Sequence, residues 1–517
     1  MTGTTIEIYD VIVVGAGGAG LMAALEAARL GCRTLLLEKE AHIGGTTAMS
    51  VGTVCTTGTD LQRARGIVDS TEAHFEDLGK FAGDLVSRDN LELRRLLVEN
   101  IPEAYRRLRE AGVQFMGPIP EPPHREPRLH AIVPHSRGYI HHLTRALRRA
   151  GGTILTSTPV RRLTQMDGRV TGVESETSGQ MRTLAATRGV ILTTGDLSGA
   201  PRAYQKRFFG EDLLVLDAIN PASTGDGHAL GEEAGGEVVN GDLATGPQLR
   251  FLAPPKTALV NRLPPIRLVG SAVLTAMKIL PDPILRPMLM SFVTTFLAPY
   301  PGVFRQGAVL INRNGQRFCD ELSLPAFKVA DQPQPHAYIV FDKAVADKLQ
   351  AWPNFISTAP GVGYAYLRDY ERSRRDIFYK ADSWQELGRK IGIDCAALSE
   401  AIENYNAALP ARSERPKLLK PPFYALGPAK PWIVHAEGGL RVDTSLRVLD
   451  RKDSPVPGLY AAGSAGQGGV LLEGHGHHLG WAFASGMLAG AAAAQESART
   501  ATTGYPVPSR NSQEIIR

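Results

Sequence analysis

The stretch that decides the fold lies near the start of the chain and reads Tyr9-Asp10-Val11-Ile12-Val13-Val14-Gly15-Ala16-Gly17-Gly18-Ala19-Gly20. Residues 9–14 are apolar and β-branched, which is typical of a buried strand in a parallel sheet. They run directly into a GxGxxG motif, and residues 21–30 continue with helical spacing and many alanines. The sequence therefore predicts a strand, a tight glycine turn and a helix in immediate succession.

A second strand and an acidic residue complete this unit. Gly31 ends the predicted helix, residues 34–37 form an apolar strand, and Glu38 follows at its end. In such a unit the glycines allow a tight turn, close approach of the backbone to a pyrophosphate, and close packing of the helix on the strand. The phosphates lie at the helix N-terminus, and the acid accepts hydrogen bonds from a ribose. These features predict a dinucleotide site in an α/β fold, with FAD favoured over a nicotinamide dinucleotide.

Composition narrows the class of protein and its partners. The 517 residues include 57 Lys and Arg against 52 Asp and Glu, so a net charge of +5 is spread over a large surface. Basic runs are absent from the sequence, so we expect no nucleic-acid partner. The N-terminal residues lack the basic and apolar regions of a signal peptide. Prolines and charges interrupt the most apolar stretch, residues 266–300, so we expect a soluble, cytoplasmic protein.

The cysteines and a group of histidines give no metal motif in the sequence. Cys32, Cys55, Cys319 and Cys395 lie far apart, with no CxxC and no Cys/His cluster along the chain. This spacing argues against a disulfide framework, a zinc site, an iron–sulfur cluster or attached haem, so we expect no metal and a reducing compartment. The histidines around Tyr139 are expected to be exposed or to cap a helix over residues 143–150: His130, His135, His141 and His142.

Further stretches resemble motifs of the fumarate reductase and 3-ketosteroid dehydrogenase flavoprotein superfamily. Residues 44–52 (GGTTAMSVG) resemble its GGxSxxSxG stretch, residues 186–195 its VILATGG strand, and residues 222–230 its ATGDG turn. Residues 309–321 resemble ILVNxxGxRFxNE, and residues 435–440 and 458–463 resemble the closing GG(L/V) and GLYAAGE elements. Because the matches follow the family's order along the chain, it is identified as a member of this superfamily.

The resemblance implies a split Rossmann-like FAD-binding domain with an inserted α+β capping domain that holds substrate against the flavin. The predicted FAD-binding parts are residues 1–303 and 433–496, and the predicted cap is residues 304–432. A Pro-rich apolar insertion at residues 254–301 could line a substrate entrance, rest on a membrane surface, contact another subunit or pack on its own cap. Residues 497–517, rich in Thr, Ser and Pro, are predicted to form a disordered tail.

The resemblance also implies how FAD is held. Thr46 and Thr47 stand where members with covalent flavin carry a histidine, so we expect non-covalent FAD. The expected cofactor contacts are Gly15, Gly17, Gly18, Ala19, Gly20, Glu38, Lys39, Gly44, Gly45, Thr46, Thr47, Ala48, Ser50, Val160, Thr194, Gly195, Asp226, Gly463, Ser464 and Leu479.

The last glycine-rich loop, residues 466–481, faces the flavin ring in this family. The helix that follows it stabilises negative charge on a reduced ring. This loop and the segment before the paired glycines supply the catalytic candidates, His435, Glu473, His475, Gly476, His477 and His478. A loop histidine or Glu473 is the expected base, and the backbone of Gly476 is the expected donor to a ketone oxygen. The histidines cannot all be catalytic, so at least one is expected to hold the loop through a backbone hydrogen bond.

Two substrate-binding arginines of fumarate reductases have no counterpart in this chain. His478 replaces one of them, and residues 343–348, where the second would fall, contain no arginine. This loss argues against a dicarboxylate substrate. The ketosteroid dehydrogenase match is also incomplete, because Leu472 stands near that branch's loop tyrosine. On the cap, Arg317 and Glu321 fit either an ion pair or a proton path.

These observations favour an FAD-dependent dehydrogenase that introduces a C=C bond α,β to a ketone in an alicyclic or steroid-like substrate. The reaction would abstract the α-proton and transfer the β-hydride to flavin N5. The expected partners are a cyclic ketone or keto acid and an external acceptor, dioxygen or a quinone. The alternatives are an enone or acrylate reductase, which runs the same atoms backwards, and a flavin-binding protein without catalysis.

Overall fold

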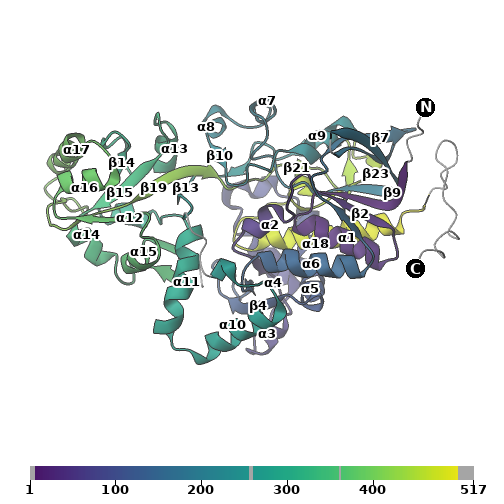
Figure 1. Cartoon of the computed structure of the whole chain (residues 1–517), viewed down its shortest axis with the longest axis horizontal. Helices are drawn as coiled ribbons and strands as arrows, with labels where there is room; N and C mark the ends of the chain where they lie inside the picture. Colours follow the sequence, from purple (N-terminus) through teal and green to yellow (C-terminus); the bar gives the residue numbers. More distant parts are fainter. Residues whose placement is uncertain (1–5, 178, 255–259, 360–362, 499–517) are drawn as a thin grey trace.

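The computed structural model describes residues 6–177, 179–254, 260–359 and 363–498, arranged as two bodies linked by the long strand β19 (Phe423–Ile433). Figure 1 shows the first body on the right and the second body on the left. Each body has its own large hydrophobic core. Nearly all of the predicted tail lies outside the described residues.

The first body is built on an eight-stranded sheet in the order β22-β23-β9-β1-β2-β6, with β8 and then β7 attached to β9. Strands β1, β2, β6, β9 and β23 pair in parallel, as a dinucleotide-binding fold requires. The sheet strands are β1 (Glu7–Val14), β2 (Thr34–Leu37), β6 (Thr153–Leu155), β7 (Val160–Met166), β8 (Arg169–Thr177), β9 (Gln180–Leu192), β22 (Arg447–Leu449) and β23 (Pro455–Ala461). The predicted strands at residues 9–14 and 34–37 are confirmed as β1 and β2.

Two helices rich in small residues cover this sheet side by side, α1 (Gly18–Arg29) and α18 (His477–Gln495). A Cβ atom on Gly486 or Gly490 of α18 would lie 2.4 Å or 2.3 Å from the carbonyl oxygens of Ala19 and Ala23 in α1. The glycines of α18 therefore let the two backbones touch. Helix α18 begins five residues before the predicted residue 482, because His477 to Trp481 continue it across the glycine loop.

The remaining helices of the first body lie around this pair. They are α2 (Gly45–Met49), α3 (Asp60–Arg63), α4 (Thr71–Gly79), α5 (Leu91–Ala111), α6 (Arg137–Arg149), α7 (Arg202–Gln205), α8 (Glu211–Leu214) and α9 (Asp226–Glu233), with 3-10 turns at Gly83–Arg88 and Gly463–Gly466. A three-stranded sheet flanks them, in the order β3 (Thr53–Cys55), β5 (Leu129–Val133), β4 (Gln114–Ile119). Helix α6 begins at Arg137, so His141 and His142 lie inside it and not at its start.

The second body contains a six-stranded sheet in which β19 pairs with four other strands. The strands are β10 (Asp217–Ala218), β13 (Gln248–Phe251), β14 (Val309–Asn312), β15 (Ala337–Phe341), β18 (Phe378–Ala381) and β19, with the hairpin β16 (Ser357–Ala359) and β17 (Gly363–Ala365). Its helices are α12 (Gly302–Arg305), α13 (Pro325–Ala330), α14 (Lys343–Lys348), α15 (Leu367–Ser373), α16 (Trp384–Ile391) and α17 (Cys395–Ala408). This body holds most of the predicted cap; its boundaries stay predictions.

Short ladders join the bodies where the chain passes between them. β12 (Ala244–Thr245) pairs with β20 (His435–Ala436), and β11 (Val238–Val239) pairs with β21 (Gly439–Leu440). β12 leads into β13, and β20 follows β19, and both of these neighbours are strands of the second body. They place the residues around Thr245 and His435 at the boundary between the two bodies.

The apolar insertion forms a 3-10 turn (Val260–Arg262) and two helices, α10 (Arg267–Ile279) and α11 (Asp282–Phe296). Helix α10 contacts β4 and β5 of the first body, and α11 contacts α15 of the second. Arg286 of α11 forms an ion pair with Asp369 of α15. The insertion therefore packs on both bodies. Among the described residues, no helix is both long enough and apolar enough to span a membrane.

Candidate active site

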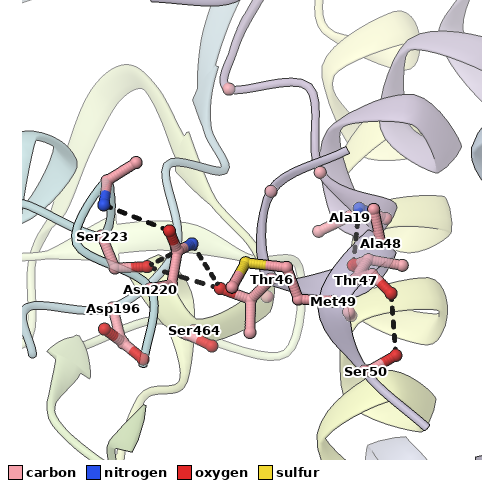
Figure 2. A pocket seen from close by; sticks show the side chains of 18 of the residues that line it. Ala19, Thr46, Thr47, Ala48, Met49, Ser50, Asp196, Asn220, Ser223 and Ser464 are labelled. Atoms are coloured by element: carbon pink, nitrogen blue, oxygen red, sulfur yellow. Dashed lines mark hydrogen bonds between the residues drawn. The ribbon is translucent and has the colours of Figure 1, made fainter. Parts of the chain in front are cut away.

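A cavity of about 860 Å³ starts at the carboxyl ends of β1, β2 and β9 and extends to β20 and the N-terminus of α18. Ligands of open α/β sheets bind at this edge of the strands, and the volume lies within the usual range for ligand pockets, about 300–1,000 Å³. Figure 2 shows part of its wall, where Thr46 and Met49 face Asn220 and Ser223. The cavity has a glycine-lined end beside α1 and a histidine-lined end beside α18.

The glycine-lined end is shaped by backbone approaches that only glycine allows. Gly15 has φ +102°, and a Cβ atom there would lie 2.6 Å from the carbonyl oxygen of Thr193. A Cβ atom on Gly20 would lie 1.8 Å from the carbonyl oxygen of Gly15, so α1 can begin directly on β1 only with glycine at this position. Gly17, by contrast, has no neighbouring atom within 4 Å of a Cβ position. This open space at the start of α1 suits a pyrophosphate.

Polar side chains frame the same end. The carboxylate of Glu38 accepts hydrogen bonds from the backbone N–H groups of Ala16 (2.8 Å) and Glu40 (3.0 Å). Thr47 Oγ1 accepts one from the Gly18 N–H (3.0 Å). These bonds join the glycine turn at residues 15–18, Glu38 and the start of α2. We call this arrangement the glycine cradle.

The structure places all of the predicted cofactor residues on the cavity wall except Gly20 and Gly44. These two lie just behind it, where Gly20 packs on β1 and the Gly44 N–H donates to the carbonyl of Ala16. On the wall, Lys39 forms a 2.9 Å ion pair with Asp226. Sequence reasoning missed Asn220, whose amide donates to Thr46 (2.8 Å) and Ser223 (3.2 Å) (Figure 2); it has no motif signal.

Replacing Glu38 with alanine is expected to weaken FAD binding about ten- to a hundredfold, because a charge-assisted contact to the ribose and the brace on the glycine turn are both lost. Titration of apoprotein with FAD measures this change. Glu99→Ala, which removes an exposed carboxylate from α5, serves as the control and should bind FAD normally. Wild-type affinity for FAD in Glu38→Ala would show that Glu38 makes no contact with the ribose.

At the other end of the cavity, the half-buried His435 and His478 and the buried Glu437 form a cluster. His435 Nε2 lies 2.9 Å from Glu437 Oε1, and His478 Nε2 lies 3.1 Å from the same oxygen. Thr245 Oγ1 donates to Glu437 Oε1 (3.2 Å), and the Gln467 amide donates to Oε2 (2.5 Å). His435 and His478 line the cavity, while Glu437 lies behind them and is only 4% exposed. The carboxylate therefore orients both rings.

The three groups have different protonation preferences. Burial by itself raises the pKa of Glu437, but the charge of His478 and the hydrogen bond from His435 outweigh it and hold this pKa well below its usual range. Burial lowers the pKa of His435, and the hydrogen bond and charge of Glu437 more than reverse this, so it is raised. Burial and then the charge of His435 lower the pKa of His478. At neutral pH, His478 is therefore neutral beside a carboxylate.

The neutral ring of His478 has a defined tautomer. Its Nε2 faces a carboxylate, which only accepts, so Nε2 carries the proton and donates to Glu437. The lone pair of His478 is then on Nδ1, where it can accept a proton from a bound molecule.

Arg250 of β13 also lines the cavity. Its Nε donates to Gln248 Oε1 (2.7 Å), and burial lowers its pKa to about 10, so it remains a cation at neutral pH. Within the described parts of the chain, no carboxylate lies within ion-pair distance of its guanidinium. Sequence reasoning missed Arg250, since a lone arginine in a short strand gives no signal. A cation without an acidic partner in a cavity is suited to bind an anionic oxygen.

Of the four remaining predicted catalytic residues, two line the cavity and two do not. Gly476 and His475 line the cavity, and His475 Nδ1 lies 2.5 Å from Glu121 Oε1. Glu473 is exposed and is not on the cavity wall; burial and the charge of Glu437 raise its pKa. His477 turns away from the cavity and its Nδ1–H donates to the Glu473 carbonyl (2.6 Å), which is the kind of loop-holding bond expected of one histidine.

One sequence expectation about histidines was wrong. His130, His135 and His142 are buried, not exposed, because the β3-β5-β4 sheet and α6 pack around them; His130, for example, lies 3.0 Å from Thr59 Oγ1. The fold also brings together a cysteine and a histidine that are distant in the chain, since Cys55 Sγ lies 3.3 Å from His124 Nε2.

Arg317 and Glu321 on the cap form part of an ion-pair network. Glu321 accepts hydrogen bonds from Arg317 (2.9 Å) and Arg415 (3.0 Å) and from the Leu310 N–H (3.2 Å). None of these residues lines the cavity. The geometry favours an ion pair that fixes the start of the cap over a proton path to this site.

The sequence of the chain matches those of known flavoproteins over most of its length. Residues 10–263 and 299–472 match the FAD binding domain family. The chain is 27% identical to an NADH:fumarate oxidoreductase from Klebsiella pneumoniae, over 88% of this chain but only 44% of that protein's length. It is 24% identical to a 3-oxosteroid 1-dehydrogenase from Mycolicibacterium smegmatis, over 95% of this chain and 97% of that protein.

Among solved structures, the chain resembles an open conformation of a flavocytochrome c3 fumarate reductase, with a TM-score of 0.72 and 23% identity over 95% of this chain and 78% of that one. The predicted fold class and the predicted FAD cofactor are confirmed, and the glycine cradle and Glu38 fit the nucleotide part of FAD. The chain therefore belongs to the FAD binding domain family and is a flavin-dependent oxidoreductase.

Proposed function

We propose that this protein is an FAD-dependent dehydrogenase that forms a C=C bond α,β to a carbonyl group in an alicyclic or steroid-like ketone or keto acid. The observation that carries the proposal is the placement of a neutral, carboxylate-held histidine, His478, and an unpaired cation, Arg250, on the wall of one cavity. A base for the α-proton and a cation for the developing enolate oxygen are what such a reaction requires.

His478 is the proposed base. Its Nδ1 lone pair accepts the α-proton of the substrate while Nε2–H keeps its bond to Glu437. The carboxylate stabilises the imidazolium that forms, as a buried carboxylate does for the base of other enzymes. Bound FAD supplies the acceptor for the β-hydride. His435 stays paired with Glu437 and is the proposed second donor to the substrate oxygen.

Arg250 and His435 define the proposed substrate class. Both are cationic or hydrogen-bond-donating groups on the cavity wall, so they favour a substrate with one oxygen-rich, anionic or polarised end. The cavity wall also carries apolar side chains, with Ile219, Val434 and Leu479 among them. This combination supports a cyclic ketone or a keto acid better than a dicarboxylate.

The relatives support both directions of reaction. One is named as a fumarate oxidoreductase and one as an oxosteroid dehydrogenase, so reduction of an enone or acrylate is the second candidate. We favour desaturation because a neutral base with a lowered pKa is suited to remove a proton, whereas reduction needs a proton donor at the same place. The proposed acceptor is dioxygen or a quinone, and the proposed location remains the cytoplasm.

Anaerobic mixing of the purified yellow protein with a panel of saturated cyclic ketones and keto acids tests the direction. We expect the visible absorption band of the flavin to bleach, with the matching enone as product. Failure to bleach, together with reoxidation of dithionite-reduced protein by an enone or acrylate, would replace the dehydrogenase by the reductase. Failure of both half-reactions would exclude both the dehydrogenase and the reductase.

A further inference from the structure

A buried cluster of four side chains with metal-ligating atoms lies behind the histidine-lined end of the cavity. Cys55 comes from β3, His74 from α4, His124 from the segment before β5, and His477 from the start of α18. The four ligand atoms all lie within 4.8 Å of one another. Each side chain is at most 9% exposed, and none of the four lines the cavity. We propose that this cluster binds one divalent transition-metal ion of the zinc type.

The separations between the ligand atoms fit a tetrahedral site. Bonds of about 2.0–2.1 Å from zinc to nitrogen and about 2.3 Å to sulfur place neighbouring ligand atoms about 3.3–3.6 Å apart. Here Cys55 Sγ lies 3.3 Å from His124 Nε2 and 3.6 Å from His74 Nε2. His124 Nε2 lies 3.2 Å from His477 Nε2. Since all four ligand atoms lie within 4.8 Å of one another, small side-chain adjustments bring them to one ion without a change of fold.

The ring arrangement agrees with a shared centre. The centroids of the rings of His74, His124 and His477 are 5.2–5.9 Å apart, and no pair is stacked face to face. Rings that converge on one ion through Nε2 take such an arrangement. One thiolate and three imidazoles are a ligand set that zinc prefers, and four protein ligands without an open position are typical of a structural site.

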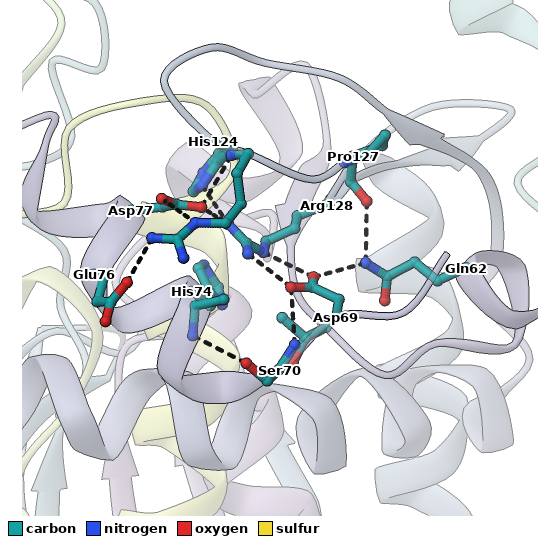
Figure 3. A network of polar contacts seen from close by, with 12 residues as sticks. Gln62, Asp69, Ser70, His74, Glu76, Asp77, His124, Pro127 and Arg128 are labelled. Atoms are coloured by element: carbon teal, nitrogen blue, oxygen red, sulfur yellow. Dashed lines mark hydrogen bonds and ion pairs between the residues drawn. The ribbon is translucent and has the colours of Figure 1, made fainter. Parts of the chain in front are cut away.

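Outer contacts hold the ligands in place. His477 Nδ1–H donates to the Glu473 carbonyl (2.6 Å), a contact typical of metal-binding histidines. Arg128 Nη1 donates to His124 Nδ1 (2.9 Å) and to Asp77 (2.6 Å), and Arg128 Nη2 donates to Asp69 (2.7 Å) (Figure 3). A guanidinium only donates, so the proton of neutral His124 is on Nε2.

The protons can be balanced for ion binding. The ion replaces the thiol proton of Cys55, which leaves as a hydrogen ion. His124 stays neutral: its proton moves from Nε2 to Nδ1, the hydrogen bond from Arg128 to Nδ1 is lost, and Arg128 keeps its ion pairs with Asp69 and Asp77. Metal binding in this cluster is therefore coupled to the release of one proton, as is general for thiol ligands.

The position of the cluster suggests what the ion does. It would join β3, α4 and the segment of His124 to His477, which follows Gly476 and precedes His478. These two neighbours line the cavity. An ion here would therefore anchor the loop that carries the proposed base from the side opposite the substrate.

Metal analysis of the purified full-length flavoprotein tests the site. From zinc-supplemented medium we expect about one zinc per chain by inductively coupled plasma mass spectrometry. After chelation, added Co²⁺ should give the visible bands of a tetrahedral site and a thiolate-to-cobalt charge-transfer band, with proton release into a weakly buffered dye solution. Of the two clusters of metal-ligating side chains among the described residues, only the one with Cys55 contains a thiol that can give that charge-transfer band.

Variants separate this cluster from other histidines. Cys55→Ser should lose the charge-transfer band, and His74→Gln should lose most of the bound zinc, while His336→Gln on the cap should retain both signals. Flavin absorbance shows whether each variant has folded. Substoichiometric zinc in the wild type with no cobalt charge transfer would overturn the proposal, and so would full zinc content in folded Cys55→Ser and His74→Gln. The assay needs no substrate, so its outcome is independent of the proposed reaction.

Discussion

His478→Ala is expected to retain bound FAD and to lower kcat about 10²- to 10⁴-fold, the usual contribution of a general base. The alanine removes the Nδ1 lone pair that accepts the α-proton, while the glycine cradle that holds the nucleotide lies at the other end of the cavity. Stopped-flow measurement of flavin reduction with the best substrate gives the rate of this step directly. His435→Ala should also lose most turnover, because Glu437 then loses one of its two histidine partners.

The lowered pKa of His478 also predicts how kcat/KM depends on pH. Because burial and the charge of His435 lower the pKa of His478 below the ordinary 6.5, its neutral form persists at pH values where an ordinary histidine is protonated. The acid limb of kcat/KM in the wild type should therefore lie below pH 6.5 and disappear in His478→Ala. His336→Ala provides the control and should leave rate and profile unchanged. Wild-type flavin reduction in both His478→Ala and His435→Ala would contradict the assignment of this end of the cavity as the reacting end.

Arg250→Met is expected to lower kcat/KM about 10²- to 10³-fold, comparable to the loss of one donor to a developing oxyanion. Methionine keeps much of the length of the arginine side chain and removes the positive charge of the guanidinium. Since Arg250 has no acidic partner among the described residues, the substitution leaves no carboxylate unpaired, and FAD content and thermal stability should be preserved. The measurement is steady-state kinetics beside a melting curve.

Substrate pairs and a second arginine sharpen this test. If Arg250 binds a substrate carboxylate, Arg250→Met should lose activity toward a keto acid far more than toward the matching neutral ketone; if it contacts the enolate oxygen, both should fall together. Arg389→Met on the exposed end of α16 is the matched control. An Arg250→Met enzyme with normal kcat/KM for both substrates would exclude Arg250 from the reaction.

The sequence was sufficient for the cofactor-binding half of the molecule. The order of strand, glycines, helix, strand and acid over residues 9–38 depends on contacts between neighbours in the chain, and such contacts have fixed spacing. Gly15 and Gly20 each permit a backbone approach that a Cβ atom would block, so these positions are marked by residue type alone. The same holds for the paired glycines and the threonines at residues 44–47.

The tertiary structure alone decided the chemistry-bearing clusters. Glu437 and His478 are 41 positions apart, and His124 and His477 are 353 apart, so no periodicity or spacing could pair them. The sequence presents His477 and His478 as equivalent neighbours, but successive residues of a helix point about 100° apart. The start of α18 therefore directs His478 to the cavity and His477 to Cys55. Arg250 became a candidate only because β13 pairs with β19 beside the cavity, and burial then determines which of these groups is charged.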